Sequence, residues 1–279
     1  MQKHYSNVLV IAGSDSGAGA GIQADLKTCF ANGIYATTVI TAVTAQNTRG
    51  VNDFCRIEPG MISSQLDAVI TDIRPDAVKT GMLPDDETIA IVGDTLRRYE
   101  LDNVVVDPVM IATSGDSLTS SDTGNALMSY LFPIAKVVTP NIPEAERLSG
   151  MVISSYDDVL EASQRILKKT GASNVLIKGG HRLSPDSDMI RDILTKADGT
   201  VTIYEHPFIS SNNTHGTGCT LSSAIASNLA KGYVVEEACR LAIDWLAAAI
   251  QAGSNLILGH GHGPVNHLWE LKEFETKLG

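Results

Sequence analysis

Residues 7–31 read NVLVIAGSDSGAGAGIQADLKTCFA: a short apolar run, a glycine-rich loop and a helical pattern. The run Asn7–Ala12 is compact enough for a buried strand, and apolar residues recur at four-residue spacing within Gly19–Ala31. A strand, a glycine loop and a helix in this order are typical of an α/β unit in which the loop lies at the carboxyl end of the strand.

The same alternation continues along the rest of the chain. After the strand and helix of residues 7–31, strands are predicted at 34–45, 76–80, 103–106, 136–139 and 174–178, and helices at 59–72, 85–99, 120–131, 143–148, 156–169, 215–230 and 235–252. Residues 188–204 are predicted to form a hairpin that turns at Asp198-Gly199. We therefore predict a three-layer α/β fold, with a mostly parallel central sheet and helices on both faces.

No long linker or internal repeat divides this pattern, so we expect one domain over residues 1–279. In a sheet of this kind, ligands bind beyond the carboxyl ends of the strands. The predicted ligand-binding loops are those that follow Ala12, Ala45, Thr80, Val106, Thr139 and Lys178.

Charge and composition narrow the function classes. The 279 residues carry a formal net charge of −11, which disfavours nucleic acid as a partner. The polar N-terminus does not have the pattern of a signal peptide, and the apolar stretch Leu241–Leu258 is too interrupted to cross a bilayer. The four cysteines form no C-x-x-C pair, so we expect free thiols in a reducing compartment. Together with the missing signal-peptide and membrane-spanning patterns, this predicts no membrane partner and a cytoplasmic location.

The strongest chemical signal is residues 213–219, NTHGTGC, which lead into a predicted helix. Its two glycines allow a tight turn, and the amides of the first helical turn have no intrahelical acceptors, so they can bind an anion. The alternative is an ordinary loop that caps a helix. The spacing of a Walker loop is absent from the sequence.

The glycine-rich loop of residues 13–21 resembles a dinucleotide-binding turn, but its glycines do not fit the G-x-G-x-x-G register. We favour a small polar ligand held there by Asp25 and backbone amides.

Other polar residues follow the remaining strands. Lys178 ends a predicted strand and could reach a phosphate, although a surface lysine is the alternative. Asp107 and Glu144 offer oxygen ligands that suit Mg²⁺, although either could simply cap a helix. Cys219 is expected at a helix N-terminus, where a lowered thiol pKa would make it a nucleophile or a base, unless it only packs.

A metal site at the histidines near the C-terminus is disfavoured because their spacing provides no further ligand set; these are His260, His262 and His267.

With these motifs in order, the sequence resembles the ribokinase-like superfamily and, within it, the hydroxymethylpyrimidine/phosphomethylpyrimidine kinases of thiamine biosynthesis. The resemblance covers nearly the whole chain. The matching stretches are AGSDSGAGAGIQADLKT (12–28), VITAVTAQNTRG (39–50), KTGML (79–83), VVDPVM (105–110), TPNIPE (139–144), KGGH (178–181), NTHGTGCTLS (213–222) and GHGPVNH (261–267).

The resemblance implies ATP-dependent phosphorylation of 4-amino-5-hydroxymethyl-2-methylpyrimidine and then of its monophosphate, by a homodimer. It implies pyrimidine contacts at Gly13, Asp25, Gln46, Met82 and Val109, and ATP contacts at Asn141, Lys178, Thr214, Gly216 and Gly218. It also implies a catalytic anion hole and charge partner formed by Gly216, Thr217, Gly218, Cys219 and Lys178. Mg²⁺ would be positioned through water by Asp107 and Glu144.

Cys219 stands where sugar kinases of this superfamily carry an aspartate base, which argues against a sugar substrate. Two alternatives remain open from the sequence. One is a pyridoxal or pyridoxine kinase of the same fold, because that ring and its hydroxymethyl group are similar. The other is a protein that binds a vitamin precursor without catalysis.

Overall fold

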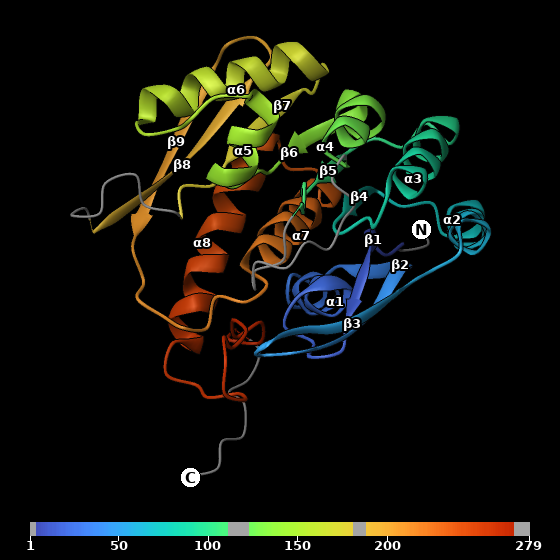
Figure 1. The fold of residues 1–279 in the computed structure, drawn as a ribbon, viewed down its shortest axis with the longest axis horizontal. Helices are drawn as coiled ribbons and strands as arrows, with labels where there is room; N and C mark the ends of the chain where they lie inside the picture. Colours follow the sequence, from blue (N-terminus) through green and yellow to red (C-terminus); the bar gives the residue numbers. More distant parts are fainter. Residues whose placement is uncertain (1–3, 111–122, 181–187, 271–279) are drawn as a thin grey trace.

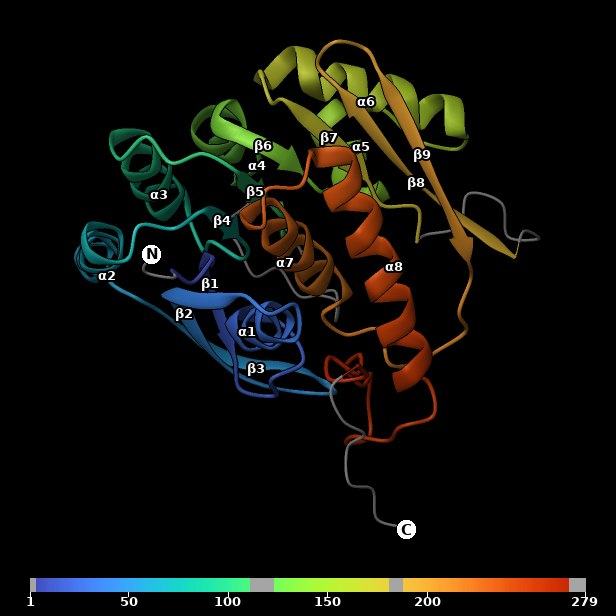
Figure 2. The ribbon, with the colours of Figure 1, turned by 180° about the vertical axis from the view of Figure 1, so that it is seen from behind.

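The computed structural model describes residues 4–110, 123–180 and 188–270, and within them nine strands form one sheet (Figures 1 and 2). The sheet order is β3-β2-β1-β4-β5-β6-β7-β8-β9. The strands are β1 (Asn7–Asp15), β2 (Tyr35–Asn47), β3 (Gly50–Arg56), β4 (Ala77–Thr80), β5 (Val104–Val106), β6 (Ala135–Val138), β7 (Asn174–Ile177), β8 (Met189–Lys196) and β9 (Val201–Pro207).

The centre of the sheet is parallel, from β2 through β1, β4, β5 and β6 to β7. The two ends are antiparallel: β3 pairs with β2, and the β8–β9 hairpin follows β7. The predicted mostly parallel sheet and the hairpin are confirmed. The carboxyl ends of the parallel strands therefore share one edge of the sheet.

Strand β3 was missed by the sequence analysis. Its only apolar side chains are Val51, Phe54 and Cys55, and they do not alternate with polar residues. Most of the strand is exposed. It pairs on one side only, with β2. An edge strand that buries neither face leaves no hydrophobic alternation for a sequence pattern to detect.

Helices cover both faces of the sheet. One layer contains α1 (Gly21–Ala31), α7 (Thr217–Ala230) and α8 (Val235–Gly253). Figures 1 and 2 show these three helices on the side of the sheet opposite α2, α3 and α6. The other layer contains α2 (Pro59–Asp72), α3 (Asp86–Arg98), α4 (Thr123–Ala126), a π-helical turn (Leu127–Leu131), a 3₁₀ turn (Phe132–Ile134), α5 (Ile142–Ser149) and α6 (Tyr156–Thr170).

The two layers explain the continuous apolar runs in the strands. In β1, Leu9 and Ile11 pack into the core under α2 and α3, whereas Val8 and Val10 pack against the layer of α1, α7 and α8. A strand buried on both faces needs apolar residues at every position, which is why Asn7–Ala12 shows no alternation. The first three residues of the helix predicted at 120–131, residues 120–122, lie outside the described residues, and so does His181 of the KGGH motif.

Candidate functional site

A cavity of about 620 Å³ opens at the carboxyl edge of the parallel strands. Residues from all six loops that were predicted to bind ligands line this cavity, and their binding of a ligand stays a prediction. The contributions by strand are Gly13 to Asp15 at the end of β1, Thr44 and Gln46 from β2, Met82 after β4, Asp107 and Val109 after β5, Asn141 after β6, and Lys178 and Gly180 after β7.

Four of the five residues expected to contact a pyrimidine lie in this cavity: Gly13, Gln46, Met82 and Val109. A Cβ atom added at Gly13 would lie 2.9 Å from the Cε atom of Met82, so the glycine lets the methionine approach the floor of the cavity closely. All four come from the strands of one half of the sheet, β1, β2, β4 and β5.

The fifth expected contact, Asp25, needs a correction. Its side chain is fully buried in α1, and it does not line the cavity. Its carboxylate accepts hydrogen bonds from Lys79 Nζ at 2.8 Å to each oxygen and from Ser223 Oγ at 2.7 Å. Asp25 thus forms an internal ion pair with Lys79, which the sequence analysis did not predict.

Lys79 is the other half of that pair and is also fully buried. Burial alone would lower the pKa of Lys79, but the adjacent Asp25 carboxylate raises it above its usual value. Burial also raises the pKa of Asp25, against the opposing effect of Lys79. Lys79 lies in the middle of the apolar strand β4, and no local pattern distinguishes it from a surface lysine.

Residues 214–219 form the wall of the cavity at the start of α7. The Thr217 amide donates to the Thr214 carbonyl oxygen, at 3.3 Å. Within the described parts of the chain, the amides of Gly218 and Cys219 have no acceptor. Two unpaired amides at a helix N-terminus are donors suited to an anion, and the anion cradle that the sequence analysis expects at residues 216–219 stays a prediction.

Gly216 shapes this cradle. Its φ of 81° lies in the left-handed region, which a side chain disfavours. A Cβ atom there would also overlap with the carbonyl oxygen of Gly19 in the first loop. The glycine therefore lets the loops of residues 13–21 and 213–219 pack against each other.

Replacing Gly216 with alanine is expected to lower kcat/KM by about 100-fold or more, because the overlap moves donors that a transferring group needs. Steady-state kinetics and thermal unfolding check this. The matched control is Gly218→Ala, since a Cβ at Gly218 makes only ordinary contacts, 3.4 Å from Asp107 Oδ2 and 3.5 Å from Lys178 Nζ. Gly218→Ala should leave the unfolding temperature unchanged. Equal unfolding temperatures for both variants would contradict the packing role of Gly216.

A charged cluster faces the cradle. Lys178 Nζ lies 3.0 Å from Asp107 Oδ1 and 4.0 Å from Glu144 Oε2. Burial lowers the pKa of Lys178, but the two carboxylates raise it above its usual value, so the lysine is charged at neutral pH. Glu144 is held by a capping box at the start of α5, in which the Asn141 amide donates to Glu144 Oε2 at 2.8 Å. Burial raises the pKa of Glu144 to about 7, although Lys178 opposes this shift.

The two carboxylates fit the magnesium ion that the resemblance implies. Asp107 and Glu144 both line the cavity, and each lies within 4.0 Å of Lys178 Nζ. Among the residues that the structure describes, no group of three or more His, Cys, Asp and Glu side chains could hold a metal alone. Mg²⁺ commonly binds through one or two carboxylates together with water and substrate phosphates, which matches this donor set.

Cys219 lies in the cradle, but its ionisation differs from the sequence expectation. Burial raises the pKa of its thiol to about 11, although Lys79 and a hydrogen bond from the Gly21 amide oppose the shift. The expected lowering of the Cys219 pKa is therefore wrong, because burial of the thiol raises its pKa. A thiol with this pKa is protonated at neutral pH and does not serve as a resting base.

The raised pKa predicts slow alkylation of Cys219. Only the thiolate reacts, so the rate should rise about tenfold per pH unit up to pH about 11. Iodoacetamide labelling followed by peptide mass spectrometry checks this, with the exposed Cys55 as an internal control. A labelling rate at Cys219 that levels off below pH 9 would contradict the prediction.

Two further features of the site escaped sequence analysis. Asp15 and His215 line the cavity, and Asp15 Oδ2 lies at hydrogen-bond distance from His215 Nε2, 2.9 Å. An apolar stripe on α8 also lines it, at the spacing of one helix face, and consists of Ile243, Leu246, Ala247 and Ile250. The stripe could have been found from its periodicity, but that pattern alone predicts only a buried face.

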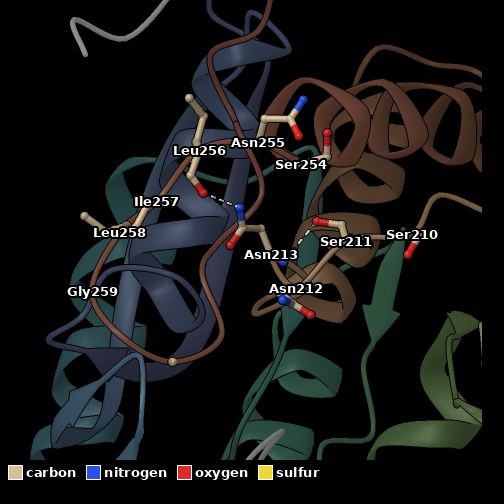
Figure 3. Close-up of a pocket in the computed structure, with 11 residues that line it drawn as sticks. Ser210, Ser211, Asn212, Asn213, Ser254, Asn255, Leu256, Ile257, Leu258 and Gly259 are labelled. Carbon is tan, nitrogen blue, oxygen red and sulfur yellow. Dashed lines mark hydrogen bonds between the residues drawn. The ribbon is translucent and has the colours of Figure 1, made fainter. Parts of the chain in front are cut away.

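A second, polar cavity of about 400 Å³ lies between residues 210–213 and 254–261 (Figure 3). Asn213 crosses between its walls: Nδ2 donates to the carbonyl oxygens of Gly253 at 2.7 Å and Leu256 at 2.6 Å. The Asn213 amide donates to Ser211 Oγ at 3.0 Å. These bonds anchor the segment that leads into the anion cradle.

The three C-terminal histidines do not converge. His267 is buried and lies 3.0 Å from Thr220 Oγ1, and burial lowers its pKa to about 3. His260 and His262 are exposed near Thr48, at the tip of the β2–β3 hairpin. All four cysteines are free thiols. In the described part of the chain, no helix is both long and apolar enough to span a membrane.

Comparison with known proteins identifies the family of the chain. A family model described as phosphomethylpyrimidine kinase matches residues 15–266. A thiamine biosynthesis bifunctional protein of Geobacter sulfurreducens is 51% identical over 94% of the chain, which spans 52% of that protein and thus about half its length. The hydroxymethylpyrimidine/phosphomethylpyrimidine kinase of Haemophilus influenzae is 46% identical, with 95% of this chain and 97% of that protein covered.

A solved structure is similar as well. It is an ADP complex of Bacillus subtilis pyridoxal kinase, with a TM-score of 0.86 and 36% identity, covering 95% of this chain and 98% of that one. Its 36% sequence identity to this chain is lower than the 46% of the kinase of Haemophilus influenzae.

Proposed function

Because the chain belongs to the phosphomethylpyrimidine kinase family of ribokinase-like phosphotransferases, we propose that it phosphorylates 4-amino-5-hydroxymethyl-2-methylpyrimidine and then its monophosphate. The phosphoryl donor is ATP, as its membership in a kinase family implies. The product of the first step would be the monophosphate ester, and that of the second step the pyrophosphate.

One observation carries the proposal. A single cavity brings together Gly13, Gln46, Met82 and Val109 from one half of the sheet, the anion cradle at 216–219, and Lys178 and Glu144 from the other half, with Asp107 between the two halves after β5. An alcohol bound in the first half and a nucleotide bound in the second would meet at the cradle. Phosphoryl transfer needs this in-line meeting and charge compensation more than it needs covalent chemistry.

We assign the roles accordingly. The amides of Gly218 and Cys219 would hold the transferring phosphoryl group, with Gly216 and Thr217 setting their position. Lys178 would offset the charge that develops on it. The substrate hydroxyl proton would pass late to an oxygen of the transferred phosphoryl group, in a loose transition state, because Cys219 is protonated at neutral pH and provides no strong base.

We propose that Asn141, Thr214, Gly216, Gly218 and Lys178 contact the ATP phosphates, while the apolar stripe on α8 faces the base of the nucleotide. Asp107 and Glu144 would hold Mg²⁺ through water. When bound with the nucleotide, the ion supplies positive charge to the phosphate oxygens.

A second candidate, pyridoxal kinase activity, is favoured by the fold similarity to a solved pyridoxal kinase. The two activities can be separated by comparing kcat/KM for hydroxymethylpyrimidine, its monophosphate and pyridoxal in a coupled ADP-release assay, with and without Mg²⁺. We expect both pyrimidines to exceed pyridoxal. ADP release with pyridoxal alone would replace the pyrimidine assignment, and no release with any alcohol would point to a binding protein.

We further propose that residues 1–279 act as one catalytic domain, and that the protein is a cytoplasmic homodimer. The four free cysteines support a reducing compartment. The terminal strand β3, with Phe54 exposed, provides an edge on which a second copy could pack. Light scattering after size exclusion measures the mass, and a monomer at micromolar concentration would contradict the dimer.

A further inference from the structure

A short C-terminal segment, residues 263–267, contacts both residues that flank the anion cradle. Before the cradle, the His215 amide donates to the Gly263 carbonyl oxygen at 3.1 Å. After the cradle, Thr220 Oγ1 lies 3.0 Å from His267 Nε2. Residues 216–219 are therefore held between two contacts with the same segment.

This segment has an anchor of its own on α8. The buried Val265 packs with Trp245 and Ala249 in a small separate core. The Asn266 amide donates to the Ala249 carbonyl oxygen at 3.1 Å. Because these contacts are with a helix rather than with the loops of the cavity, residues 263–267 provide a fixed support for the start of α7.

The protonation of His267 determines the direction of its bond to Thr220. Burial and the nearby charge of Lys27 lower the pKa of His267 to about 3, so the ring is neutral at working pH and carries a single N–H. That N–H is used in a hydrogen bond to the backbone of Val265. His267 Nε2 is then an acceptor, and the Thr220 hydroxyl donates its proton to it.

The Thr220 hydroxyl is thereby directed away from its own helix. Other buried hydroxyls in the helices of this chain donate to the carbonyl oxygen four residues earlier, as do those of Thr28, Ser163, Thr170 and Ser227. Such a bond often bends the helix. For Thr220 the carbonyl four residues earlier is that of Gly216, which begins the cradle and already accepts from the Thr220 amide at 2.9 Å.

We propose that His267 is a positioning residue, which holds the Thr220 hydroxyl away from the Gly216 carbonyl and so preserves the shape of the first turn of α7. The amides of Gly218 and Cys219 belong to that turn. The inference rests on the proposed function, because these amides would hold the transferring phosphoryl group. Small displacements of groups that orient a reaction have large effects on its rate.

The first test measures the single-turnover rate of pyrimidine phosphorylation at saturating Mg²⁺ and ATP. His267→Phe keeps a ring in the buried site but offers no acceptor, so the Thr220 hydroxyl is free to turn to Gly216. The rate should fall about 10- to 100-fold. Binding of 4-amino-5-hydroxymethyl-2-methylpyrimidine alone, measured by isothermal titration, should be unchanged, because the cavity residues Gly13, Met82 and Val109 follow other strands.

A second substitution separates positioning from packing. Thr220→Val keeps the shape of threonine but has no hydroxyl to donate to Gly216, so His267→Phe/Thr220→Val should return to within about threefold of the wild-type rate. His267→Gln keeps an acceptor near the position of Nε2 and should also stay within about threefold. If the double variant is as slow as His267→Phe, or if His267→Phe lowers the unfolding temperature but not the rate, His267 is merely structural and the proposal is overturned.

A further readout needs no phosphoryl transfer. The amide NMR signal of Gly218 in the ligand-free protein should shift in His267→Phe and return towards its wild-type position in the double variant. A wild-type protein that releases no ADP, with variants that show this pattern, would sustain the inference and defeat the proposed kinase function. An active kinase whose Gly218 signal does not move in His267→Phe would sustain the kinase and overturn the inference.

Discussion

Replacing Lys178 with methionine is expected to lower kcat by about 10²- to 10³-fold, the usual loss when one charge partner of a transition state is removed. Lys178 Nζ lies 3.5 Å from the position of a Cβ atom built at Gly218, so it is next to the amides that we propose to hold the phosphoryl group. Its charge is held by Asp107 and Glu144 at 3.0 and 4.0 Å. Single-turnover kinetics with saturating ATP and pyrimidine measure the loss.

Lys178→Arg is the matched control. It keeps the positive charge in a different shape and should retain more activity than Lys178→Met. Binding of the pyrimidine alone should be unchanged in both variants, because Gln46, Met82 and Val109 lie on the other half of the sheet. A Lys178→Met enzyme with kcat within a factor of about three of wild type would remove the lysine from the mechanism.

For Lys79, which pairs with Asp25, we expect a large loss of stability and a small loss of activity. Lys79→Met should destabilise the protein by about 3–5 kcal/mol, because the fully buried Asp25 carboxylate would lose its countercharge. Activity per folded molecule should fall far less than in Lys178→Met, since Lys79 does not line the cavity. Urea unfolding followed by circular dichroism measures the stability.

Lys79→Met/Asp25→Asn provides the control. The asparagine keeps the shape of Asp25 and a partner for Ser223 but removes the unpaired charge, so most of the lost stability should return. If the double variant is no more stable than Lys79→Met, packing rather than charge explains the loss, and the interpretation of Asp25 and Lys79 as an ion pair that stabilises the fold is wrong.

Much of the fold followed from local patterns. The helix at residues 59–72 was predicted with the bounds that the structure shows, and the strands of the parallel centre were located to within about three residues at each end. These elements carry their own signal, because a buried strand is apolar throughout and a surface helix repeats every 3.6 residues. Strand β3 carries no such signal, since it is an exposed edge defined only by its pairing with β2.

The candidate site divides in the same way. The loops at strand ends and the cradle of NTHGTGC could be found in the sequence, because parallel topology brings strand ends together and glycines mark tight turns. The expected placement of Asp25 in the pocket and the expected low pKa of Cys219 were both wrong. Each depends on burial, which neighbours remote in sequence create.

By itself, therefore, the sequence determined the three-layer α/β architecture, the edge of the sheet where ligands bind, and the kinase family. Only the tertiary structure decided that Asp25 pairs with Lys79, 54 residues away, and that Asp15 pairs with His215, 200 residues away. Periodicity and turn chemistry act over a few residues and leave a trace in the sequence. Ion pairing and desolvation act through space, between side chains that folding alone brings together.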